Sequence, residues 1–72
     1  MKTAAQLKLG EKGIVAGFSD SDMSLKLIEM GVLPGQEIQF QFAAPFNGPR
    51  CFRLRGYSLS LRLNEAEAIS LN

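Results

Sequence analysis

The sequence predicts a mainly β fold, a small barrel of about five antiparallel strands with one α-helix inserted after the first strand. Two observations predict it. Short apolar or alternating runs recur along most of the chain between glycine, proline and asparagine turns, which is typical of successive antiparallel strands. Only the segment after the first run has the apolar spacing of a helix. Curling so few strands into a barrel is the simplest way to protect the edges of the sheet.

The first strand is predicted at residues 14–18, an apolar run of strand length flanked by glycine. Residues 19–22, Ser-Asp-Ser-Asp, carry side chains that accept hydrogen bonds from the free N–H groups at a helix start. A helix should follow, because apolar residues recur at spacings of four and three up to Met30. Gly31 should end the helix as a left-handed cap, since glycine adopts a positive φ at little cost.

The second strand is predicted at residues 37–42, which alternate between polar and apolar side chains without interruption. Ile38, Phe40 and Phe42 are therefore expected on one face of it. The preceding residues 32–35, Val-Leu-Pro-Gly, have the order of proline and glycine that a type II turn prefers. The chain should thus reverse its direction between the helix and this strand.

Two further strands, at residues 51–55 and 57–63, alternate in the same way and should form a hairpin through the glycine between them. Residues 43–49 are expected to be a loop, because proline donates no hydrogen bond to a sheet. Residues 64–67 have the chemistry of a helical turn, and residues 68–71 supply a last short strand.

Length and composition limit the possible functions. Seventy-two residues, 46% hydrophobic and 21% charged, fit one domain over residues 1–72 with one small core. The chain has no histidine and one cysteine, Cys51, so catalytic residues, a cofactor and a metal site of its own are not expected. A substrate pocket is not expected either, because most apolar residues are needed for the core. The lack of a disulfide pair, a signal segment and a long apolar run predicts a cytoplasmic protein.

The balance of charges bears on the class of partner. Eight lysine and arginine residues against seven acidic residues give a net charge of +1. A protein that binds a nucleic-acid duplex usually has a marked positive excess, because neutralised phosphates supply much of its affinity. Nucleic acid is therefore not the expected partner, and a small-barrel nucleic-acid binder is kept as an alternative.

Three motifs of the chain resemble the FeoA family. Residues 27–35, Leu-Ile-Glu-Met-Gly-Val-Leu-Pro-Gly, are similar to its apolar helix end, glycine and Leu-Pro-Gly before a strand. Residues 44–49, Ala-Pro-Phe-Asn-Gly-Pro, resemble the Ala-Pro-Leu-Gly-Asp-Pro loop of the family, and residues 56–62 resemble its strand ending in Leu-Arg. The motifs agree in order and spacing over residues 9–72. The loop has Asn-Gly at residues 47–48 where the family often has Gly-Asp, so a negative charge that is common there is absent.

The resemblance implies an SH3-like β-barrel in the cytoplasm that serves bacterial ferrous iron uptake as an accessory protein. Its partner would be the membrane transporter FeoB, through the cytoplasmic G-protein domain, and it would meet the membrane only through that partner. Direct association with Fe²⁺ is suggested by the family alone. A similar barrel forms a carboxyl-terminal module of repressors related to the diphtheria toxin repressor. A regulatory or peptide-binding module of that type is therefore a second alternative.

Six residues are candidate partner contacts: Leu25, Ile28, Val32, Phe46, Arg53 and Arg55. Leu25 and Ile28 fall outside the apolar stripe of the helix, so they and Val32 would form a docking patch for the transporter or for a second copy of the domain.

The other three candidates lie outside the helix. Phe46 lies between two prolines, where an exposed aromatic side chain can meet a partner. Arg53 and Arg55 should project from one side of their strand as a basic face that pairs with carboxylates of a partner. As a further alternative, one of them would stabilise the charge on the transferring phosphate of a nucleotide bound to the partner. Packing against the core and plain solvation are the competing explanations for all six residues.

Overall fold

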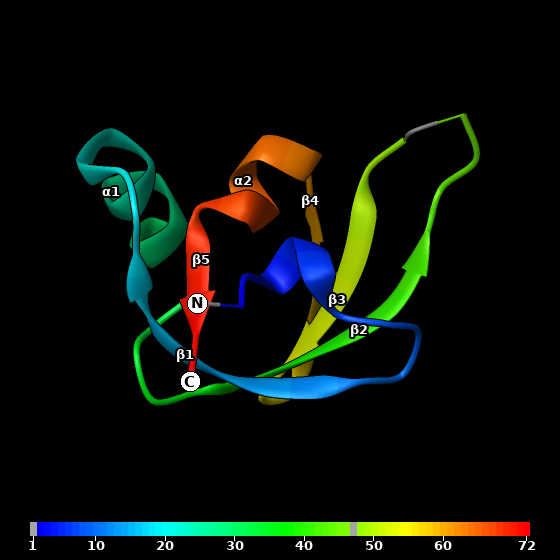
Figure 1. Ribbon diagram of the computed structural model, residues 1–72, viewed down its shortest axis with the longest axis horizontal. Helices are drawn as coiled ribbons and strands as arrows, with labels where there is room; N and C mark the ends of the chain where they lie inside the picture. Colours follow the sequence, from blue (N-terminus) through cyan, green and yellow to red (C-terminus); the bar gives the residue numbers. More distant parts are fainter. Residues whose placement is uncertain (1, 47) are drawn as a thin grey trace.

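The computed structural model describes residues 2–46 and 48–72 and contains one five-stranded antiparallel sheet with a helix of nine residues beside it (Figure 1). The strands are β1 (Lys12–Phe18), β2 (Glu37–Ala43), β3 (Arg50–Leu54), β4 (Tyr57–Leu61) and β5 (Ile69–Leu71). The helical elements are α1 (Ser21–Glu29), α2 (Leu63–Glu67) and the 3₁₀ turn η1 (Ala4–Gln6). The predicted fold class is confirmed, with the main helix directly after the first strand.

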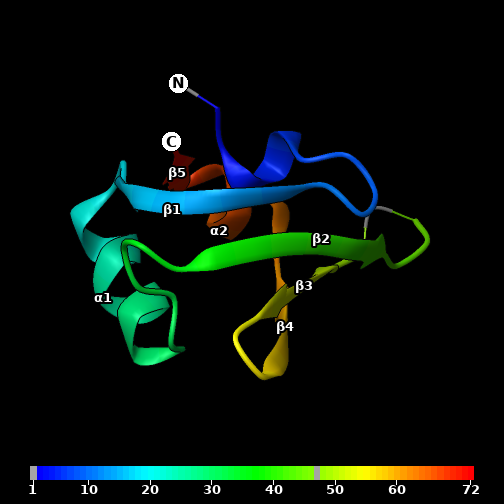
Figure 2. The same cartoon turned by 90° about the horizontal axis from the view of Figure 1, so that it is seen from below.

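The strand order is β4-β3-β2-β1-β5, so β1 to β4 form a meander and β5 returns to the far side of β1. Figure 2 shows β1 and β2 side by side, with β3 and β4 turned away from them. A bulge interrupts the pairing of β2 with β3, and another interrupts the pairing of β1 with β5. Because a bulge bends its strand and increases the local twist, these two irregularities help five short strands to wrap around one core.

The core receives side chains from all five strands and from α1. Its largest fully buried side chains are Phe52, Leu27, Ile38, Leu61, Ile69, Leu71, Val15 and Val32. The rings of Phe40 and Phe52 lie with their centroids 5.5 Å apart and their planes tilted by 43°. In β3 the predicted alternation is confirmed, since Phe52 and Leu54 are buried and Arg53 is exposed.

Helix α1 begins and ends as the sequence predicts. The Asp20 carboxylate caps its start by accepting hydrogen bonds from the backbone N–H groups of Asp22, at 2.9 Å, and Met23, at 3.4 Å. Leu27 is fully buried, and Met23 packs against the core with part of its surface. Gly31 follows the helix with a φ of 95°, a conformation that a residue without a Cβ atom adopts at little cost.

The predicted face of β2 is wrong at its last aromatic residue. Phe42 is 57% exposed, whereas Ile38 and Phe40 are buried. Phe40 pairs with Phe52, and Phe42 pairs with Cys51. Between these two pairs β2 moves on by two residues, whereas β3 moves on by only one. This slip moves Phe42 to the outer face, because side chains alternate between the two faces of a sheet.

Other boundaries also differ from the predictions. Strand β3 covers Arg50–Leu54 rather than residues 51–55, so Arg55 lies in the hairpin turn. Strand β4 ends at Leu61 rather than at residue 63, because Leu63 begins α2 and its side chain is exposed. Strand β1 begins at Lys12, two residues before the predicted start. The helical turn and the last strand are confirmed, with the strand starting at Ile69.

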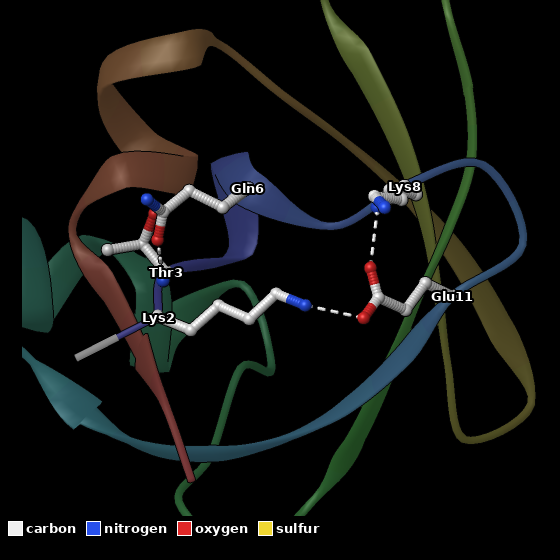
Figure 3. A network of polar contacts seen from close by, with 5 residues as sticks. All are labelled: Lys2, Thr3, Gln6, Lys8 and Glu11. Carbon is white, nitrogen blue, oxygen red and sulfur yellow. Dashed lines mark hydrogen bonds and ion pairs between the residues drawn. The ribbon is translucent and has the colours of Figure 1, made fainter.

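A polar network joins the amino-terminal segment to the start of β1 (Figure 3). The Lys2 ammonium pairs with the Glu11 carboxylate, which also accepts a hydrogen bond from the Lys8 backbone N–H at 2.8 Å. These two donors hold the pKa of Glu11 below its ordinary value. The Thr3 N–H donates to Gln6 Oε1 at 2.8 Å and so closes the turn of η1, which packs against α2 and β5.

Candidate functional site

A groove of about 730 Å³ opens on the outer side of the sheet. It is lined by outward side chains of β1 and β2, by residues 33–36 after α1, and by residues 53–56 in the β3–β4 hairpin. Figure 2 shows the segment after α1 and this hairpin projecting on the same side of β2. The groove therefore gathers three parts of the chain that are distant in sequence.

Hydrogen bonds hold residues 33–36, the segment after α1 that forms one side of the groove. The Gly35 N–H donates to the Val15 carbonyl oxygen at 2.7 Å, and the Gln36 N–H donates to the Leu33 carbonyl oxygen at 3.2 Å. The Gln36 side chain in turn accepts a hydrogen bond from the Leu33 N–H at 3.2 Å. Gly35 has a φ of 91°, as the third position of the predicted type II turn requires. This bonding holds Leu33 at the groove with 42% of its surface exposed.

The pairing of the strands sets a row of polar side chains across the sheet. Lys12 of β1 pairs with Gln39 of β2, which pairs with Arg53 of β3. Neighbouring strands lie about 4.8 Å apart, so the backbones of Lys12 and Arg53 are separated by about 10 Å. Arg55, in the hairpin turn, also lines the groove. Arg53 and Arg55 are thus brought to one site, in accord with their predicted common side.

The groove carries an excess of positive charge. Lys12, Arg53 and Arg55 line it together with one carboxylate, that of Glu37. The Lys12 Nζ atom lies 3.8 Å from Glu37 Oε1, so these two charges compensate each other. Neither arginine forms an ion pair within residues 2–46 and 48–72. Their exposed guanidinium groups are free to bind carboxylates of another molecule.

Three of the other predicted contact residues are exposed at separate places. Leu25 and Ile28 are 66% and 43% exposed on α1, so the helix has the surplus apolar surface that the sequence indicates. Phe46 is 99% exposed in the loop between β2 and β3. Figures 1 and 2 show this loop and α1 at opposite ends of the molecule, so Phe46 does not join the helix residues in one patch.

The prediction that Val32 contributes to the docking patch is wrong, because its side chain is fully buried. The Val32 N–H donates to the Leu27 carbonyl oxygen, and the Gly31 N–H donates to that of Ile28, both at 2.9 Å. This pair of bonds is a Schellman motif, which turns the chain back over the helix end and brings the residue after the glycine onto the last turn. Val32 therefore belongs to the core with Leu27.

Sequence reasoning missed the apolar residues of the groove. Leu33, which was not among the six predicted contacts, faces the groove after the Schellman motif. Ile14 is 39% exposed on the outer face of β1, while Val15 is fully buried. An uninterrupted apolar run offers no alternation from which to assign the two faces, so only the pairing partners of β1 could have identified Ile14.

The described residues hold no group of three or more histidine, cysteine, aspartate or glutamate side chains that could bind a metal ion. Cys51 is a half-buried free thiol whose sulfur lies 3.5 Å from Gln41 Oε1. Across residues 2–46 and 48–72, no helix has the length and apolar character needed to cross a bilayer. What the surface offers is binding chemistry, namely exposed apolar side chains and free guanidinium groups.

The FeoA domain model matches residues 2–72. Among solved structures, the chain is similar to a FeoA-like protein from Clostridium acetobutylicum, with 36% identity, a TM-score of 0.86, and coverage of 100% of this chain and 88% of that chain. FeoA from Chlorobium tepidum is 25% identical, with a TM-score of 0.85 and coverage of 99% of this chain and 69% of that chain. The curated proteins give no match.

More distant structures share the fold. FeoA from Stenotrophomonas maltophilia, solved with zinc, is 21% identical, with a TM-score of 0.83 and coverage of 100% of this chain and 91% of that chain. It is described as an SH3 domain protein and a possible activating factor of ferrous iron transport. A manganese-dependent transcriptional repressor has a TM-score of 0.82 at 20% identity, over 94% of this chain and 39% of that chain. The fold is therefore SH3-like.

Proposed function

The chain belongs to the FeoA family of small SH3-like proteins associated with ferrous iron transport, and we propose that it binds the cytoplasmic G-protein domain of a FeoB-type transporter. In this role the chain is a cytoplasmic accessory protein that modulates the transporter by contact. It performs no catalysis and needs no metal ion or cofactor of its own.

The main observation that supports the proposal is the exposed apolar surface of α1. Leu25 and Ile28 are three positions apart, so they lie on the same side of the helix. Leu27 already supplies the fully buried contact of that helix, which means that the two exposed side chains are not needed for the core. Apolar side chains gathered on one helix face are typical of surfaces that bind another protein.

Isothermal titration of the chain with the isolated G-protein domain tests the proposal. Replacing Leu25 and Ile28 together by serine should weaken binding at least about tenfold, because each side chain would lose its burial in the complex. Lys8→Gln, at an exposed position outside α1, is the control and should bind as the wild type does. Equal binding by the serine variant would exclude the helix patch, and absence of any binding by the wild type would refute the contact itself.

A second candidate function is stimulation of GTP hydrolysis by the partner, which the free guanidinium groups of Arg53 and Arg55 favour. An arginine that reaches a bound nucleotide stabilises the charge that develops on the transferring phosphate. Addition of the chain would then accelerate phosphate release by the G-protein domain, and changing both arginines to alanine would abolish the acceleration. Under the contact proposal alone, phosphate release by that domain does not depend on these two residues.

A further inference from the structure

The fold leaves an apolar part of the groove open. Ile14 and Leu33 remain partly exposed there, although their sequence neighbours Val15 and Val32 are fully buried. Pro34 lines the groove next to Leu33 and adds a rigid apolar ring. An apolar side chain that entered this part of the groove would remove these surfaces from water, which is favourable.

The other side of the groove holds two arginines that form no ion pair among the described residues. Lys2, Lys12 and Lys26 each have a carboxylate partner in the described part of the chain, whereas Arg53 and Arg55 have none. A guanidinium group donates two parallel hydrogen bonds to a carboxylate and is easier to dehydrate than an ammonium group. The complementary ligand of this side therefore carries carboxylates.

The positions of the two sides fit an extended chain. Residues 33–36 supply the apolar side of the groove, and residues 53–56 supply the cationic side. Successive side chains of an extended peptide point in opposite directions, and alternate side chains on one face are about 7 Å apart. Acidic residues at alternate positions can thus reach Arg53 and Arg55, while the residues between them face Leu33 and Pro34.

We propose that the groove binds an extended segment of a partner protein in which acidic and apolar residues alternate. Because the partner is taken to be the transporter, this binding mode rests on the proposed function, and it adds the chemistry of the recognised segment. It also assigns Ile14, Leu33 and Pro34 to the interface.

A labelled chain titrated with a synthetic peptide and followed by NMR tests this binding mode. The probe is an eight-residue peptide of alternating glutamate and leucine, and the control peptide has glutamine in place of every glutamate. The glutamate peptide should shift the amide resonances of Leu33, Arg53 and Arg55, and the glutamine peptide should bind at least about fivefold more weakly. Shifts confined to other parts of the chain, or equal binding of the two peptides, would overturn the proposal.

Three variants of the chain sharpen the test. Changing Arg53 and Arg55 together to glutamine should weaken binding of the glutamate peptide at least about fivefold, since two charge-assisted contacts are lost. Arg62→Gln removes an exposed arginine outside the groove and should leave binding unchanged. Glu37→Gln removes the one carboxylate of the groove and should strengthen binding about twofold. Unchanged binding by the double variant, or tighter binding of a single-stranded oligonucleotide of equal charge, would refute the acidic segment.

The same variants separate failure of this binding mode from failure of the proposed function. If the G-protein domain binds the double arginine variant as tightly as the wild type, the acidic segment is refuted and the transporter contact stands. If the peptide binds as expected but the G-protein domain does not bind at all, the groove stands and its partner is another protein.

Discussion

Gly31 connects the end of α1 to the β3–β4 hairpin through a close contact with Tyr57. A Cβ atom at Gly31 would lie well inside van der Waals contact with the Tyr57 hydroxyl oxygen. That hydroxyl donates a hydrogen bond of 3.3 Å to the Met30 carbonyl oxygen. A side chain at position 31 would therefore strain the backbone and also displace the tyrosine that joins the helix to β4.

Gly31→Ala should lower the free energy of unfolding by about 2 to 3 kcal/mol, from the left-handed backbone and the lost tyrosine contact together. Urea unfolding followed by circular dichroism measures the change. Gly17→Ala is the control, since a Cβ atom there meets no atom within 4 Å and its φ is not positive. Equal losses in the two variants would show that the contact at Gly31 has no special importance.

Phe46 combines full exposure with a φ of 59°, which is unfavourable for a bulky side chain. Asparagine adopts this conformation more readily, so Phe46→Asn should raise the free energy of unfolding by about 0.5 to 1 kcal/mol. If Phe46 contacts the partner, the same variant should bind the G-protein domain more weakly. A variant that is both less stable and equally able to bind would contradict the strain and the predicted contact.

At the scale of the elements, the bulge in β2 decides which aromatic side chains stabilise the fold. Phe40 lies before the bulge in the core, and Phe42 lies after it on the outer face. Phe40→Ala should destabilise the protein by about 3 to 5 kcal/mol, whereas Phe42→Thr should change its stability by less than about 0.5 kcal/mol. Thermal or urea unfolding compares the stabilities of the two variants. A large loss of stability in the Phe42 variant would mean that the alternation of β2 continues without a slip.

An ion pair connects the two α-helices. The buried Glu65 carboxylate of α2 lies 2.6 Å from the Lys26 ammonium nitrogen of α1 and accepts a hydrogen bond of 2.7 Å from the Arg62 N–H. Burial by itself would raise the pKa of Glu65, but the bonds from Lys26 and Arg62 outweigh it and hold the pKa below the ordinary value of 4.5. The ionised form of Glu65 is therefore favoured by folding.

A carboxyl whose pKa is lowered in the folded state stabilises the protein above its unfolded pKa, and this contribution is lost as the pH falls through the folded pKa. Glu65→Gln should thus cost about 1 to 2 kcal/mol at neutral pH and less below about pH 4, because the wild type loses the same contribution there. Urea unfolding at both pH values measures this. Glu67→Gln, an exposed position in α2, should show no such difference. An equal cost of Glu65→Gln at the two pH values would exclude the ionic contribution.

At the scale of the whole molecule, the features that depend on near neighbours in the sequence were predictable. The cap at Asp20, the helix end at Gly31 and the turn at Gly35 follow from residues one to four positions away. The alternation of β3 likewise predicts that Arg53 faces outward. Local hydrogen bonds and side-chain periodicity determine all of these features, so one sequence is enough to identify them.

The features that depend on tertiary pairing were not predictable in the same way. The slip at Phe42 arises from the pairing of β2 with β3, and the burial of Val32 arises from the fold-back of the chain over α1. The groove needs β1, the turn after α1 and the β3–β4 hairpin to be placed together, and no spacing in the sequence relates Ile14 or Leu33 to Arg53. The alternation around β3 identified Arg53 and Arg55 as outward-facing, but nothing in the sequence identified the apolar side of their site.

Contact with the G-protein domain of the transporter is the central claim, and an NMR titration of the labelled chain with that unlabelled domain tests it most directly. The account predicts that resonances of Leu25 and Ile28 on α1, and of Arg53 and Arg55 in the groove, shift or broaden first. Resonances of η1, at the amino-terminal end of the chain, should stay in place. A spectrum that does not change in the presence of excess domain would contradict the account.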